Sequence, residues 1–220
     1  MKAILKKIIW LIMAVPAIYL AAVWNKLPTT VAMHFDLQGH PDRYGDKSEL
    51  ITMVSVMIVV NAVVYLILTN IYRIDPKKYA SENKDRLQSI GIAIAVFIAA
   101  ILTVIVYSTL QGSIRISMGL IFAGVGLLLA IVGNYLPNLK PNYFAGLRLP
   151  WTLENEDNWR RTHRLAGKLF FAGGLLLAVI CLFTPPVASI IIFFAGTMIM
   201  VIIPCVYSYR IYKRQKPGGN

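Results

Sequence analysis

Long apolar runs separated by short polar segments dominate the chain. Six runs are long enough, or nearly so, to cross a hydrocarbon core, which takes about 20 helical residues. They cover residues 4–24, 50–72, 89–110, 115–136, 166–183 and 187–209. Stretches such as IGIAIAVFIAAILTVIVY lack the apolar–polar alternation of a membrane β-barrel strand. The pattern therefore predicts an all-α polytopic membrane protein with six transmembrane helices.

Composition and charge placement agree with this prediction. Hydrophobic residues make up 57% of the 220 residues and charged residues 15%, against roughly 25% in soluble domains. The net charge is +12, yet the predicted outer segments hold only four of the 22 basic residues, Lys26, Arg43, Lys47 and Arg115. Because cytoplasmic loops carry the excess of Lys and Arg, both termini are expected in the cytoplasm. The basic excess thus indicates topology and attraction to membrane lipid, with no direct nucleic-acid binding.

The connections divide the chain into four predicted parts. Residues 1–72 form a first transmembrane hairpin, whose extracytoplasmic loop, 25–49, is expected to be a structured run of turns. Residues 73–136 hold a cytoplasmic loop and a second hairpin, residues 137–209 a polar motif segment with a third hairpin, and residues 210–220 a basic cytoplasmic tail. A signal peptide at the N-terminus is the alternative to the first span, but its apolar core is usually only about 7–15 residues long.

The central parts of the predicted spans contain none of the ionisable residues that usually mark ion and proton pathways. Asn61, Tyr65 and Thr69 share one face of the second helix. Hydrogen bonding between helices explains such a face, and a small-molecule or lipid transporter that uses it is the alternative. Close helix contacts are predicted at the glycines at positions 119, 124, 126, 133, 173 and 174.

The outer polar segment, LPTTVAMHFDLQGHPDRYGDKSEL, covers residues 27–50. Prolines and glycines punctuate it, which predicts turns rather than a helix. Imidazole and carboxylate groups are both zinc ligands, and four such residues occur here: His34, Asp36, His40 and Asp42. Their spacing matches no familiar zinc motif, so no metal is expected, and an outer-loop metalloprotein is the weaker alternative.

The inner polar segment, GLRLPWTLENEDNWRRTHRLAG, covers residues 146–167. Thr152 is the predicted N-cap of a helix whose first turn carries acidic residues, as the helix dipole favours. Trp159, His163, Ala166 and Phe170 then share one helical face. We expect this amphipathic helix to lie along the inner interface and to bend into the fifth span. Its tryptophan and arginines would then either anchor it at the lipid or bind a partner.

The inner segment resembles the signature of the SdpI family of bacterial integral membrane proteins, G-[IV]-R-T-P-W-T-L followed by W-x-x-T-H-R-x-[AG]-G. The residues that carry this resemblance are Asn142, Gly146, Arg148, Pro150, Trp151, Thr152, Trp159, Thr162, His163, Arg164 and Gly167. The outer segment is similar to the extracytoplasmic loop of many members through Leu27, Pro28, His34, Phe35, Gly39, Pro41, Asp42, Gly45 and Lys47. Leu149 departs from the family's Thr, and His40 from a common acidic residue.

The resemblance implies immunity to a peptide toxin that attacks the membrane, and inward signalling by capture of a small winged-helix repressor. It implies a protein of the bacterial cytoplasmic membrane. A toxin would meet the outer loop at His34, Phe35, Gly39, Pro41, Asp42, Gly45 and Lys47, and a cytoplasmic partner the residues of the inner motif. Of the latter, Arg148 and Arg164 are expected to contact anionic or hydrogen-bonding groups, Trp151 and Trp159 to be anchors, and His163 to link helix and loop.

No catalytic role is expected, because no nucleophile, base and orienting group can be assembled from residues on one side of the membrane. No cofactor is expected either.

Overall fold

The computed structural model of the chain describes residues 2–36, 40–77, 80–112 and 117–215. It contains six long helices: α1 (Lys2–Val23), α2 (Lys47–Asn70), α3 (Lys84–Gln111), α4 (Met118–Tyr135), α6 (Glu156–Phe183) and α7 (Pro186–Gln215). All six are long and apolar enough to cross a membrane, which confirms the predicted six-helix architecture. The shorter elements are η1 (Trp24–Lys26), β1 (Thr30–Phe35), β2 (Pro41–Asp46), η2 (Ile71–Arg73), η3 (Ala80–Asn83), η4 (Leu136–Asn138) and α5 (Pro150–Glu154).

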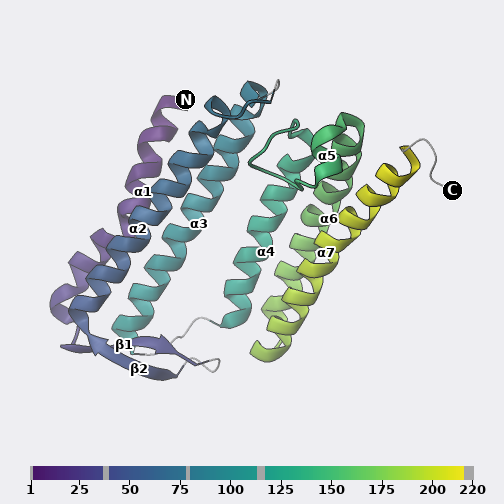
Figure 1. Ribbon diagram of the computed structural model, residues 1–220. Coiled ribbons are helices and arrows are strands. Elements are labelled where there is room, and N and C mark those ends of the chain that lie inside the picture. The colour runs from purple at the N-terminus through teal and green to yellow at the C-terminus, as the bar shows by residue number, and fades with distance from the viewer. Residues whose placement is uncertain (1, 37–39, 78–79, 113–116, 216–220) are drawn as a thin grey trace.

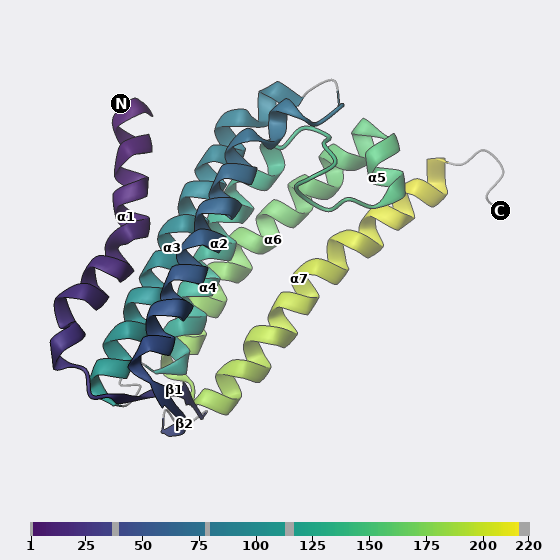
Figure 2. The same ribbon diagram turned by 60° about the vertical axis from the view of Figure 1, so that its left-hand side comes forward.

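The long helices form two groups of three. α1, α2 and α3 pack together, α4, α6 and α7 make the second group, and α3 and α4 join the two. Both chain ends and α5 lie at one end of the bundle, and the two strands lie at the other (Figure 1). Figure 2 shows α5 between the ends of α6 and α7, both of which it contacts. The arrangement agrees with termini on one side of the membrane, and the identity of that side stays a prediction.

Small residues bring α4 and α6 into close contact. Three glycines of α4, seven residues apart, lie against the backbone of α6: Gly119 at Cys181, Gly126 at Gly174, and Gly133 at Phe170 and Phe171, while a Cβ on Gly167 would lie 2.8 Å from the carbonyl oxygen of Gly133. A Cβ on Gly126 would lie 2.7 Å from the carbonyl oxygen of Gly174, so neither helix has room for a larger side chain here. The contacts predicted from the glycines of α4 are thus confirmed.

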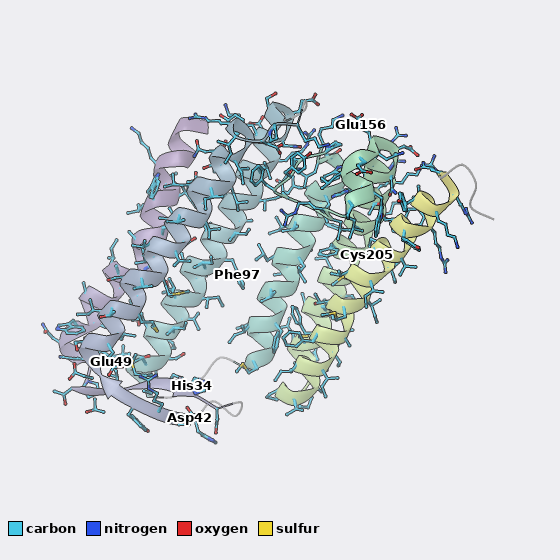
Figure 3. The ribbon with its side chains drawn as sticks, viewed as in Figure 1. His34, Asp42, Glu49, Phe97, Glu156 and Cys205 are labelled. Carbon is cyan, nitrogen blue, oxygen red and sulfur yellow. The ribbon has the colours of Figure 1, made fainter. Side chains whose placement is uncertain are left out.

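A second contact of α4 joins the two groups. A Cβ on Gly124 would lie 3.1 Å from the Phe97 ring, which points from α3 toward α4 (Figure 3). In the first group, the buried Asn61 of α2 donates from Nδ2 to the carbonyl oxygen of Ala95 in α3 at 3.0 Å. Thr69 donates to Tyr65 of its own helix at 2.8 Å. The Asn61 bond joins two helices, which favours the packing explanation of the polar face on α2.

The outer segment is an antiparallel β-hairpin, so the prediction of turns alone is wrong. β1 and β2 pair with Thr30 opposite Asp46, and the register shifts on either side of His34. Val31 and Ala32 are buried, and the Thr109 hydroxyl of α3 donates to the carbonyl oxygen of Ala32 at 3.4 Å. Burial against α3, rather than the Pro- and Gly-containing local sequence, therefore accounts for the strand.

Asp46 ends β2 and caps α2. Its side chain accepts the N–H of Ser48 at 2.8 Å, while the Glu49 side chain accepts the N–H of Asp46 at 3.3 Å. The hydrogen bonds from Ser48 lower the pKa of the Asp46 carboxyl. This reciprocal capping fixes where the hairpin turns into the second span.

α6 is one continuous helix from Glu156, so the predicted interface helix that bends into the fifth span is wrong. The reason is that Trp159, His163 and Ala166, which share one face of this helix, are buried by protein. Thr152 is not the N-cap of this helix: Asn155 caps it by accepting the N–H of Asn158 at 2.9 Å. Thr152 belongs instead to the separate short helix α5.

Candidate functional site at the two ends of the bundle

The chain between η4 and α5, residues 139–149, forms a folded loop that we call the motif loop. Asn142, 1% exposed, shapes it by accepting the N–H groups of Phe144 and Ala145 at 2.9 and 2.7 Å. Asn83, next to the start of α3, exchanges two hydrogen bonds with the backbone of Lys140, at 3.1 and 2.8 Å. The motif loop is therefore tied to the first helix group as well as to its own.

His163 fastens the motif loop to α6. Its Nε2 accepts the backbone N–H of Leu147 at 3.0 Å, and its Nδ1 lies 2.9 Å from the carbonyl oxygen of Trp159. Because Nε2 accepts, the proton is on Nδ1 and the ring is neutral. Gly146, with φ +99°, leaves room for the ring, since a Cβ there would collide with Nε2. The predicted polar contact of His163 between helix and loop is confirmed.

Trp159 also holds the motif loop against α6. It is 1% exposed, its ring stacks on His163 at 3.9 Å between centroids, and its Nε1 donates to the carbonyl oxygen of Leu139 at 2.8 Å. An anchor at the lipid interface would leave its ring partly outside the protein. Trp159 thus anchors the motif loop, and the prediction that it could lie at the lipid interface is wrong.

A buried polar cluster joins α5, α6 and α7. The Asn158 amide donates to the carbonyl oxygen of Ser208 at 3.1 Å, and its Oδ1 accepts the hydroxyls of Ser208 and Thr162 at 2.9 and 3.0 Å. Trp151 donates from Nε1 to the Ser208 hydroxyl at 2.8 Å and stacks on Tyr212 of α7. Trp151 therefore anchors α5 to α7.

Two members of this cluster, Asn158 and Ser208, are absent from the sequence prediction. Asn158 precedes Thr162 by one helical turn, so helical spacing could have placed it beside the motif. Ser208 has no such signal, because it stands among apolar and aromatic residues of α7, 50 positions from Asn158.

The remaining motif residues divide by exposure. The Thr152 hydroxyl is fully buried and lies 2.9 Å from the carbonyl oxygen of Leu147. Gly167 packs against Pro137 and Gly133. By contrast Arg148, Pro150 and Arg164 are exposed, and Arg148 donates to the carbonyl oxygen of Tyr143 at 2.8 Å. The buried residues shape the site, and the exposed ones are available for contacts.

At the other end of the bundle, one polar pair crosses the hairpin and one ion pair joins β2 to α2. His34 Nδ1 and Asp42 Oδ1 lie 2.6 Å apart (Figure 3), and Arg43 contacts Glu49 at 3.2 Å. Among the described residues, no group of three or more His, Cys, Asp or Glu side chains is arranged to hold a metal ion. Phe35, Pro41, Gly45 and Lys47 also lie on the hairpin or next to it, while Gly39 lies outside the described residues.

A cavity of about 280 Å³ lies beneath the hairpin, and we call it the hairpin cavity. Its wall comes from β1, α2, α3 and α4 and is mostly aliphatic, with His34 and Phe35 at the strand side. Ser108 of α3 lines it and is 2% exposed, and within the described part of the chain its hydroxyl has no hydrogen-bond partner. The hydroxyl oxygen is itself shielded from the open space of the cavity, so the aliphatic wall suits an apolar group.

These features define a polytopic α-helical membrane protein with a β-hairpin over an apolar cavity at one end and a polar motif at the other. The model of the SdpI/YfhL protein family matches residues 138–208, and that of a domain of unknown function (DUF1648) matches residues 11–59. Immunity protein SdpI of Bacillus subtilis (strain 168) is 30% identical over 172 residues, 77% of this chain and 81% of that protein. No solved structure matches. The chain belongs to the SdpI/YfhL family.

Proposed function

We propose that this chain is an immunity protein of the bacterial cytoplasmic membrane, which protects its cell from a membrane-active peptide toxin without enzymatic chemistry. The observation that carries the proposal is the identity with Immunity protein SdpI over most of both chains. The test is survival: expression of the chain in a strain killed by such a peptide should restore growth. Equal killing with and without membrane-inserted protein would refute the proposal.

The hairpin end is the proposed toxin-facing end. The hairpin offers polar and charged side chains, among them His34, Asp42 and Lys47, and the cavity beneath it offers an apolar wall. A membrane-active peptide is itself apolar with regularly spaced carbonyl groups. An apolar side chain of the toxin would fill the cavity.

We expect Ser108→Met to abolish most of the protection. The longer side chain would occupy the cavity that Ser108 lines, so the proposed ligand loses its space. Survival at several toxin concentrations, divided by the amount of membrane-inserted protein, measures the effect. An exposed serine in α2 supplies the matched control: Ser55→Met adds the same atoms outside the hairpin cavity and should protect like the unchanged protein.

The motif end is the proposed signalling end, where a winged-helix repressor would bind. In this proposal the buried motif residues, such as Trp159 and His163, hold the motif loop in shape, and the exposed Arg148 and Pro150 contact the partner. Trp151 contributes indirectly, by holding α5 against α7. Co-purification of the repressor with the membrane-inserted chain, and its loss in Arg148→Glu, would support this role.

The proposal requires the hairpin outside and the motif inside. We expect reporter fusions after Lys84 and Asn155 to give cytoplasmic signals, and one at Gln38 to give an external signal, because Lys and Arg are concentrated on the cytoplasmic side. An external signal at Asn155 would invert the assignment of the two ends.

A further inference from the structure

Four cationic side chains lie on one exposed face of α6, at the end of the bundle that holds both termini. They are Arg160, Arg161, Arg164 and Lys168. Helical spacing puts this face opposite the one that carries Trp159 and His163. Because that opposite face is fixed against the motif loop, the basic face has to point away from the protein core.

The basic face is concave. The four cations, Leu165 and Tyr207 of α7 line a pocket of about 520 Å³, which we call the basic pocket. Leu165 is an apolar surface beside the charges, and Tyr207 adds a phenol group from the second helix. A purely solvated face would need neither a hollow nor an apolar wall.

The charges of the basic pocket are only partly neutralised. Asp157 accepts from Arg160 at 2.8 Å and lies 2.7 Å from Arg161. Among the described residues, the side chains of Arg164 and Lys168 make no ion pair and no hydrogen bond. These two residues lie further along α6, where the helix becomes apolar and approaches the predicted hydrocarbon region. Uncompensated cations at that depth favour an anionic partner.

We propose that the basic pocket binds the phosphate headgroup of an anionic phospholipid. Phosphate oxygens would accept from the planar guanidinium of Arg164 and from the ammonium of Lys168, which are the usual protein donors to phosphate. The acyl chains would continue along Leu165 and the exposed apolar residues of α6 and α7. Basic pockets between transmembrane helices on the cytoplasmic side commonly hold such headgroups. The site is independent of toxin binding at the hairpin.

The test uses the full chain in phosphatidylcholine nanodiscs, with phosphatidylglycerol added in increasing mole fraction. Native mass spectrometry then counts retained lipids, and the thermal midpoint reports stabilisation. We expect selective retention of phosphatidylglycerol, and a loss of about tenfold or more in its affinity in Arg164→Gln/Lys168→Gln, because two charged hydrogen bonds are removed. Lys168→Arg should keep the affinity, since it keeps the charge.

The matched control removes two charges at the same end but outside the basic pocket. Lys213→Gln/Arg214→Gln, on exposed positions of α7, should leave the affinity within about twofold. An equal loss in both double variants would reduce the effect to general surface charge and overturn the proposal. Inorganic phosphate is the second arm: if it binds the protein as tightly as phosphatidylglycerol and competes with it, the pocket takes phosphate and the lipid assignment is wrong.

Discussion

Gly174→Ala should destabilise the helix bundle by about 2 kcal/mol, although alanine favours an isolated helix over glycine by about 1 kcal/mol. The added Cβ would lie 2.6 Å from the carbonyl oxygen of Gly126 and 2.7 Å from the backbone nitrogen of Ala130. Both are backbone atoms that cannot rotate away, so α4 and α6 have to separate. Overpacking of this kind costs about 1–3 kcal/mol, and more when a whole interface moves. Thermal unfolding in detergent measures the loss.

The neighbouring glycine is the matched control. A Cβ on Gly173 would meet the thioether of Met200, which is the flexible end of a side chain and can move. Gly173→Ala should therefore be neutral or stabilising by up to about 1 kcal/mol, through helix propensity alone. If both alanine variants unfold at the same midpoint, the backbone contact between α4 and α6 is not the controlling feature.

The six spans were predictable because each is a long apolar run, but their ends were not. The prediction starts the fifth span at residue 166, while α6 begins at Glu156, and it starts the third at residue 89, while α3 begins at Lys84. A hydropathy pattern identifies only the part of a helix that lies in lipid. The polar first turns of α6 remain helical because Trp159 and His163 bury one face against the motif loop.

The β-hairpin could not be predicted from local sequence, because its pairing depends on distant contacts. Its second strand, PDRYGD, consists largely of residues that disfavour strands, so propensity indicates turns. The pairing depends on Val31 and Ala32, which are buried beside distant parts of the chain such as Thr109. The capping of α2, by contrast, was readable from the spacing of Asp46 and Glu49, a known helix-start signature that the sequence prediction did not use.

The motif end was predictable only in part, because local spacing identifies contacts within one helix and misses contacts between distant parts of the chain. Helical spacing alone places Trp159 and His163 on one face, and the structure confirms that His163 links this face to the loop. The other partners come from far along the chain: Asn83 bonds Lys140 at a separation of 57 residues, and Ser208 bonds Asn158 at a separation of 50. No single-sequence pattern identifies such pairs, since each partner is an ordinary small polar residue.

His163→Phe should release the motif loop while leaving the six helices inserted. Phenylalanine can still stack on Trp159, but it has no acceptor for the Leu147 N–H, and a buried donor without a partner costs about 1–3 kcal/mol. The larger ring also crowds Gly146, which already lies against Nε2. The rate of trypsin cleavage after Arg148 depends on the fraction of molecules in which the motif loop is open. In the detergent-solubilised protein this rate should rise on the order of 10–100-fold.

A second variant, His163→Gln, separates the contribution of the hydrogen bond to Leu147 from that of ring stacking on Trp159. The side-chain carbonyl of glutamine in His163→Gln can still accept the Leu147 N–H but cannot stack as an aromatic ring, so cleavage after Arg148 should increase less than in His163→Phe. The thermal midpoint of the bundle should change little in either variant, because Asn142 and Trp159 still hold the rest of the motif loop. Cleavage of His163→Phe at the rate of the unchanged protein would mean that the Leu147 bond does not hold the loop closed, and the motif would then owe its shape to Trp159 and Asn142 alone.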